Sequence, residues 1–113
     1  YQWYRAQLTS RIPPLLAHWE PRIGVLAAQV RTKRMRTRWG SCNIQEKRIW
    51  LNVELMKKPP SCLEYVLVHE LIHLLERNHT LRFRELMDNH MPKWRALRDE
   101  LNAAPLAHEA WQY

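Results

Sequence analysis

The first part of the chain carries apolar positions at helical spacing, interrupted by prolines. This spacing predicts one helix over residues 2–11 and a second, shorter helix over 15–20. Pro13 and Pro14 are expected to separate the two, because proline lacks the N–H group that a helix interior needs and its ring crowds the preceding turn. The apolar residues of both helices are expected to form core.

The middle of the chain changes to runs rich in β-branched and aromatic residues. These runs predict strands over residues 29–36 and 48–53. Neither face of the first strand is cleanly apolar, which indicates an exposed strand. Residues 39–47 are expected to form a long, irregular hairpin link, in which Gly40, one of two glycines in the chain, marks an unusual backbone position.

Helical spacing returns in the last part of the chain. A strongly apolar segment predicts a helix over residues 61–77, with Ser61 as its N-cap and Glu64 completing a capping box. Thr80 is expected to cap a further helix, and a last helix is expected over residues 94–101.

The long apolar helix contains His69, Glu70 and His73, an HExxH pattern. Residues four apart lie about 40° apart around a helix axis and about 6 Å apart along it, so both imidazoles can reach one small cation. Glu70 can reach a water bound to that cation and take its proton. The pattern therefore predicts a hydrolytic zinc site with Glu70 as general base. Two histidines on a buried stripe without a metal would be costly to desolvate.

His79 is the expected third ligand. In a continuing helix it would lie about 9 Å beyond the second histidine and face away from it, so the helix must end first. That turn is expected at residues 76–78, with Asn78 suited to a left-handed C-cap. Glu85 and His90 remain alternative third ligands, because a following helix can bring them back to the metal.

A small sheet followed by an HExxH helix is the zincin arrangement, an α+β fold with a small antiparallel sheet packed on helices. One such domain is expected over residues 1–113, as the C-terminal part of a longer chain, and the sequence pattern specifies the tail after Asn102 only weakly. In this architecture an edge strand flanks the metal cleft and can hold an extended peptide as an added strand. Both predicted strands, 29–36 and 48–53, are candidates for that role.

Composition and charge limit the class of protein. The chain is 46% apolar, which is too hydrophobic for a disordered segment, and no stretch approaches the roughly 20 apolar residues of a membrane span. Cys42 and Cys62 are the two cysteines, and in a small domain without a secretory signal they are expected to be reduced, in the cytoplasm.

The net charge of +7 is concentrated in one run of basic residues: Arg31, Lys33, Arg34, Arg36 and Arg38. Such a run can attract the phosphate groups of nucleotides or DNA, or it can be a solvated strand face. The sequence leaves both interpretations open.

The segment 39–42 also has two interpretations. It is either a structural turn with Trp39 in the core, or a wall of the substrate cleft beside the metal, because it joins the two strands expected to border the HExxH helix. Cys42 is not expected to be a ligand, since a fourth protein ligand would close the position that a hydrolytic zinc leaves for water.

Several separated blocks of the chain resemble one known family. They are, in order, residues 38–42, 49–52, 65–73, 78–80 and Phe83. These blocks are similar to those of the YgjP-like metal-dependent hydrolases, zincin-like proteins related more distantly to the WLM and SprT-like metalloproteases. The resemblance covers roughly residues 3–101.

The resemblance implies a general base at Glu70 and zinc ligands at His69, His73 and His79. Family members usually have serine where this chain has Thr80, a change that keeps the hydroxyl, and often an aromatic residue where it has Arg84. They also usually have an additional N-terminal β region, which fits the expectation that a longer chain precedes this one.

Three functions are compatible with these residues. The one we expect is a zinc metallopeptidase that acts on a peptide or protein substrate, including a DNA-associated protein. The second is a nucleoside-triphosphate pyrophosphatase, an activity that the resemblance also allows and that needs cations such as Arg36 or Arg38 facing the metal. The third is a noncatalytic nucleic-acid-binding domain with a structural zinc. Structural zinc sites usually have four protein ligands, so three candidate ligands make this function less favoured.

Overall fold

The computed structural model describes residues 1–103. The weakly specified tail after Asn102 therefore lies outside the described residues except for residue 103. The elements in order are α1 (Gln2–Ile23), β1 (Gln29–Lys33), β2 (Gly40–Asn43), β3 (Arg48–Asn52), the 3-10 helix η1 (Val53–Lys57), α2 (Pro60–His73), α3 (Leu81–His90) and α4 (Trp94–Asn102). No helix within the described residues has the length and apolar character needed to cross a bilayer.

Helix α1 is continuous, which corrects the prediction of two helices divided by prolines. Pro13, Pro14 and Pro21 lie inside it, and all three are exposed. The carbonyl groups that lose a donor there lie on the solvent side, where water can bind them. On the other side a buried apolar stripe runs past the prolines without a break, formed by Leu8, Ile12, Trp19 and Ile23. Tertiary packing of this stripe therefore outweighs the local preference of the prolines.

The three strands form one sheet in the order β1-β3-β2. β1 pairs with β3 in parallel and β2 pairs with β3 antiparallel, so the sheet is mixed and the prediction of an antiparallel sheet is wrong for one of its two pairs. The expected irregular link contains β2, which the sequence pattern did not reveal because Gly40–Asn43 has no apolar alternation. β1 ends at Lys33, short of the predicted end at residue 36.

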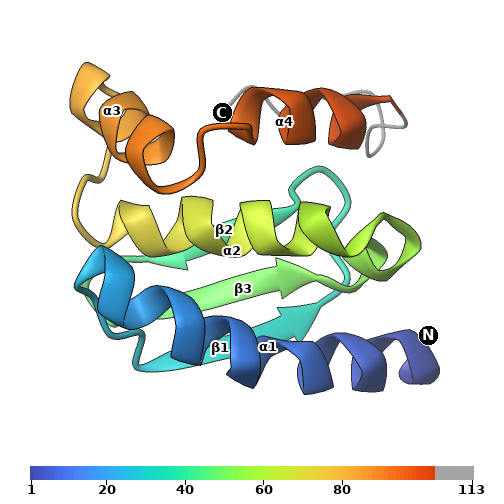
Figure 1. The fold of residues 1–113 in the computed structure, drawn as a ribbon. Coiled ribbons are helices and arrows are strands. Elements are labelled where there is room, and N and C mark those ends of the chain that lie inside the picture. Colours follow the sequence, from blue (N-terminus) through green and yellow to red (C-terminus); the bar gives the residue numbers. More distant parts are fainter. Residues whose placement is uncertain (104–113) are drawn as a thin grey trace.

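The helices cover one face of this sheet. Figure 1 shows α1 and α2 in front of the sheet, with α3 and α4 above α2. Ile49 and Leu51 of β3 project from the covered face and are fully buried. Trp50 projects from the opposite face, where Arg31 and Lys33 of β1 lie over its ring at 6.0 and 4.7 Å. This part of the basic run is therefore a solvated strand face.

Helix α2 lies at the centre of the molecule and is apolar on all sides, with ten of its 14 residues buried. Its N-cap is Pro59, with no side-chain cap bond, and Pro60 supplies a preset backbone angle for the first turn. The capping box predicted at Ser61 therefore does not form. The Glu64 carboxylate instead accepts a hydrogen bond of 2.8 Å from the Trp19 indole, which ties α2 to α1.

Helices α3 and α4 complete the fold on the side of α2 away from the sheet (Figure 1). Thr80 caps α3 as predicted, since its hydroxyl accepts a hydrogen bond from the Phe83 N–H at 3.3 Å. α4 starts at the predicted residue, Trp94, whose ring stacks on Tyr65 of α2 at 6.5 Å between centroids. The Trp94 indole donates to the Asp88 carboxylate at 2.7 Å, which links the two last helices.

Candidate metal centre and active-site cleft

Helix α2 carries two of the three predicted metal ligands. His69 and His73 lie one helical turn apart, and their Nε2 atoms are 3.2 Å from each other. His69 is 1% exposed, because α2 is surrounded by the sheet on one side and by α3 and α4 on the other. The burial that makes α2 the core helix therefore also shields its first histidine from water.

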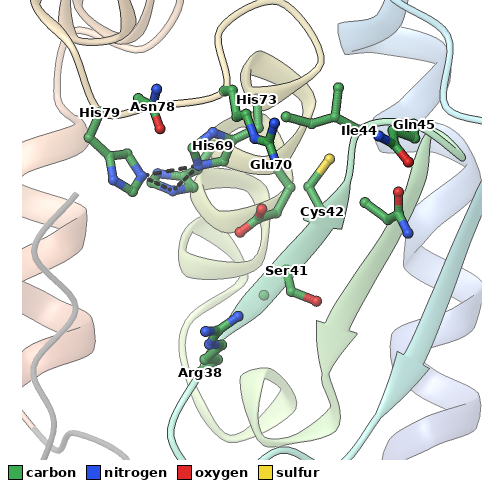
Figure 2. A pocket seen from close by; sticks show the side chains of 13 residues that line it. Arg38, Ser41, Cys42, Ile44, Gln45, His69, Glu70, His73, Asn78 and His79 are labelled. Atoms are coloured by element: carbon green, nitrogen blue, oxygen red, sulfur yellow. Dashed lines mark hydrogen bonds between the residues drawn. The ribbon is translucent and has the colours of Figure 1, made fainter.

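The turn after α2 brings His79 to the same point. The helix ends at His73 and not at residue 77 as predicted, and the next residues form a tightened turn. Asn78 is not left-handed, since Lys47 is the only non-glycine residue with positive φ in the described part of the chain. The His79 Nε2 atom lies 3.3 Å from that of His69 and 3.0 Å from that of His73 (Figure 2).

The three Nε2 atoms have the spacing that a tetrahedral metal requires. With metal–nitrogen distances of about 2.0–2.1 Å, the edge of a zinc tetrahedron is about 3.3–3.4 Å. The observed separations are 3.0–3.3 Å. In addition, the His73 Nδ1–H group can donate to the Glu76 carbonyl oxygen at 3.1 Å, which leaves the Nε2 lone pair for a metal. The donor set therefore fits a divalent ion that prefers nitrogen.

Burial keeps these imidazoles in the neutral form that a metal ligand needs. It lowers the pKa of His69 well below the usual range, and it lowers the pKa of His73. For His79, burial and the neighbouring His73 lower the pKa to about 4. Proton competition for the three nitrogens is therefore weak at neutral pH.

Phe83 supports the three histidines together, a role that the sequence pattern did not assign. Its ring centroid lies 4.9, 4.6 and 4.9 Å from those of His69, His73 and His79. The side chain is 1% exposed and projects from the first turn of α3, which Thr80 caps. The only available signal was its place in the family resemblance, because a buried phenylalanine at helical spacing looks like ordinary core.

The Glu70 carboxylate lies beside the histidines and is nearly inaccessible, at 2% exposure. Burial raises its pKa to about 8, and the positive charge of Arg38 acts in the opposite direction. A carboxyl group that titrates near neutral pH can accept a proton and return it, which is the property required of a general base.

Strand β2 forms the wall that faces Glu70. A β-carbon built on Gly40 would lie 2.8 Å from Val66 Cγ1 and 2.9 Å from Glu70 Oε2. Only glycine therefore fits at this position without displacing the carboxylate. On the same strand, burial and the charge of Glu70 raise the pKa of the Cys42 thiol to about 12.

The residues of segment 39–42 lie in two different environments. Trp39 is 2% exposed and belongs to the core. The next three residues line a cleft of about 730 Å³ together with the predicted site residues. The lining residues are Arg38, Gly40, Ser41, Cys42, Asn43, Ile44, Gln45, His69, Glu70, His73, Arg77, Asn78 and His79.

The remaining sequence candidates lie elsewhere. Within residues 1–103, the cluster that could hold a metal ion contains the three histidines and none of Glu85, His90 and Cys42. Arg36 does not line the cleft, whereas Arg38 does (Figure 2). The edge strand beside the cleft is β2, and neither predicted strand has this place. The predicted strand 48–53 is the central strand of the sheet, and the predicted strand 29–36 lies at the other edge and contributes no β1 residue to the cleft.

Comparison with known proteins identifies the family to which the sequence is similar. A family model described as YgjP-like, metallopeptidase domain, matches residues 1–104 of the chain. The family resemblance noted from the separated sequence blocks is thereby confirmed. No curated protein matches the chain.

Two solved structures are similar in fold. The metallopeptidase zymogen abylysin of Pyrococcus abyssi has a TM-score of 0.72 at 20% identity, over 80% of this chain and 90% of that one. The metallopeptidase zymogen jannalysin of Methanocaldococcus jannaschii has a TM-score of 0.67 at 18% identity, over 78% and 90%. At such identities the likeness concerns the fold alone, and it confirms the zincin-like α+β class.

Proposed function

Because the chain belongs to the YgjP-like metallopeptidase family, we propose that it is a zinc-dependent peptidase whose active site is the cleft between α2 and β2. One observation supports this above the others. Three imidazole nitrogens converge within 3.0–3.3 Å beside a carboxylate that is 2% exposed.

The proposed ligands are His69, His73 and His79, and three neutral imidazoles favour zinc among the common divalent ions. When bound, zinc would supply Lewis acidity for the substrate carbonyl and lower the pKa of a water. Three protein ligands leave one position of a tetrahedron open, which suits a catalytic site more than a structural one.

Glu70 is the proposed general base. Its carboxylate is expected to accept the proton of the attacking water and to deliver it to the nitrogen of the leaving amine. The wall of β2 holds this carboxylate from the other side, because its Oε2 atom lies directly over Gly40. The helix thus provides the group and the strand limits where that group can lie.

Strand β2 is also the proposed binding edge for an extended peptide. Among residues 1–103 it pairs with β3 on one side only, and its residues line the cleft. Backbone N–H and C=O groups on a free strand edge can hold a substrate segment as an added strand. A peptide or protein substrate can bind this edge through its backbone alone, and no nucleotide base or phosphate group is needed.

The free thiols of Cys42 and Cys62 fit a reducing compartment, for which we propose the cytoplasm.

The test is hydrolysis by the zinc-loaded protein of a casein-type substrate and, separately, of nucleoside triphosphates, each against a Glu70→Gln control. Cleavage of casein that depends on zinc and on Glu70 is the expected result. Hydrolysis of nucleotides with casein left intact would replace the peptidase by a phosphohydrolase. No hydrolysis of either substrate, with zinc tightly bound, would favour a noncatalytic domain.

A further inference from the structure

Arg38 lines the same cleft as Glu70 and the three histidines, two residues before β2 begins. From its placement we infer that Arg38 is a substrate-recognition residue that selects peptides with a carboxylate close to the scissile bond. This inference rests on the proposed peptidase function and goes beyond it by naming a substrate class. Figure 2 shows Arg38 at one end of the cleft and the histidines at the other, with Glu70 between them in this view.

The backbone around Arg38 is held firmly by a buried side chain. Asn52 is fully buried, and its amide nitrogen donates to the carbonyl oxygens of Met35 at 2.9 Å and Arg38 at 2.7 Å. The Asn52 backbone N–H also donates to the Trp39 carbonyl oxygen at 3.0 Å. A fixed backbone reduces the entropy lost when the side chain binds a ligand, so Arg38 is preorganised for recognition.

The guanidinium of Arg38 is available to a ligand. The residue is exposed, and among residues 1–103 no ion pair neutralises it, whereas Arg34 on the same segment lies 3.5 Å from Glu54. Its side chain and the Glu70 carboxylate line the same cleft, with Glu70 between Arg38 and the histidines in the view of Figure 2. Arg38 is therefore close enough to the reaction to contact groups near the scissile bond.

The charge of the cleft points to an anionic partner. Its charged lining residues other than the histidines are Arg38, Arg77 and Glu70. Glu70 is buried, whereas both arginines are exposed, so an incoming substrate meets positive charge. The planar guanidinium fork matches a carboxylate in bidentate geometry, and a lysine or arginine of a substrate would be repelled there. Acidic peptides are therefore the class that this cleft favours.

The experiment compares matched fluorogenic peptides that differ only in Glu or Gln, at each of three positions on either side of the scissile bond. At one or more positions, the zinc-loaded protein should prefer the Glu peptide by about three- to tenfold in kcat/KM. A preference of this size lies between the small effect of an exposed ion pair and the larger effect of a desolvated one. Arg38→Gln should remove the preference and Arg38→Lys should keep part of it. The change should lie in KM, because a contact made equally in the ground state and transition state affects binding alone.

Arg36→Gln is the matched control, since Arg36 lies on the same segment, is exposed and does not line the cleft. It should retain the full preference. High salt should weaken the preference in the wild type, because about 1 M salt reduces the screening length to about 3 Å.

A binding measurement separates this inference from the proposed function. Fluorescence anisotropy with the same labelled peptides on the Glu70→Gln protein needs no cleavage. Tighter binding of the Glu peptide that disappears with Arg38→Gln supports the inference whether or not peptides are hydrolysed. An unchanged preference for the Glu peptide over the Gln peptide in the Arg38→Gln variant overturns the inference. An equal fall in kcat on both peptides also overturns it, because Arg38 would then act on Glu70 and not on the substrate.

Discussion

The two walls of the cleft are built in different ways. The α2 wall presents the side chains proposed for metal binding and proton transfer, His69, Glu70 and His73, held by one turn of a buried helix. The β2 wall contributes mainly backbone and small residues, of which Gly40 lies against Glu70 itself. The contribution of the α2 wall depends on which chemical groups its side chains carry. The contribution of the β2 wall depends on how little space its residues occupy.

This difference teaches where substitutions should act. On α2 a change removes a group, so metal binding or proton transfer should be lost. On β2 a change adds or removes volume, so the position of Glu70 and the fit of the substrate should change while the metal stays bound. Four single substitutions and one double variant test this contrast.

The largest effect is expected on the helix wall from His73→Ala. Removing one of three converging nitrogens should abolish tight zinc binding and with it all zinc-dependent hydrolysis. Metal content after dialysis, measured by elemental analysis, checks this. His90→Ala is the matched control, because His90 lies outside the ligand cluster of the described residues and should keep the metal. Equal metal content in wild type and His73→Ala would remove α2 as the ligand platform.

Glu70→Gln should separate metal binding from chemistry on the same wall. Zinc content should stay at the wild-type level, while the hydrolysis rate should fall by about 10²–10⁴-fold, the usual cost of losing a general base. Single-turnover rates alongside metal analysis provide the measurement, with Glu85→Gln as an exposed control that should keep its rate. Loss of zinc in Glu70→Gln would show that the carboxylate supports the metal.

Gly40→Ala should affect the strand wall by adding volume. The new methyl group would overlap Val66 and Glu70, so we expect about 1–3 kcal/mol of lost stability from overpacking and a rate lowered up to about 100-fold by displacement of Glu70. Zinc content should not change. Urea unfolding and kcat measure the two effects separately.

The double variant Gly40→Ala/Val66→Ala sharpens this test. Val66→Ala removes both γ-methyl groups, including the Cγ1 that overlaps the added carbon. Alanine at position 40 should therefore cost less stability in the Val66→Ala background than in the wild type. The overlap with Glu70 Oε2 remains, so the loss of rate should persist. If the rate recovers together with stability, Gly40 serves the fold and does not position Glu70.

The smallest effect is expected from Cys42→Ser, also on the strand wall. The exchange keeps the size of the side chain, and Cys42 lies outside the three-histidine cluster. Zinc content and rate should stay within about twofold of the wild type, because the substitution removes no proposed ligand and leaves the packing nearly unchanged. If the thiolate were a ligand, metal would be lost, and the wild type would show a sulfur shell near ~2.3 Å in X-ray absorption.

The sequence by itself determined the helix wall. An i, i+4 pair of histidines with an adjacent glutamate has nearly the same geometry in any α-helix, so His69, Glu70 and His73 follow from local spacing alone. The N-cap of α3 at Thr80 and the start of α4 at Trp94 were likewise determined locally, because capping and apolar periodicity act over a few residues.

Only the tertiary structure decided the rest of the site. Pairing with β3 makes Gly40–Asn43 a strand, and contact with α2 makes Gly40 a limit on Glu70. The role of Phe83 beneath three histidines arises because α3 folds back over α2, and α1 stays continuous through its prolines because a buried stripe outweighs them. These features depend on contacts between segments far apart in the sequence. Local helix and strand propensities do not include the free energy of such contacts.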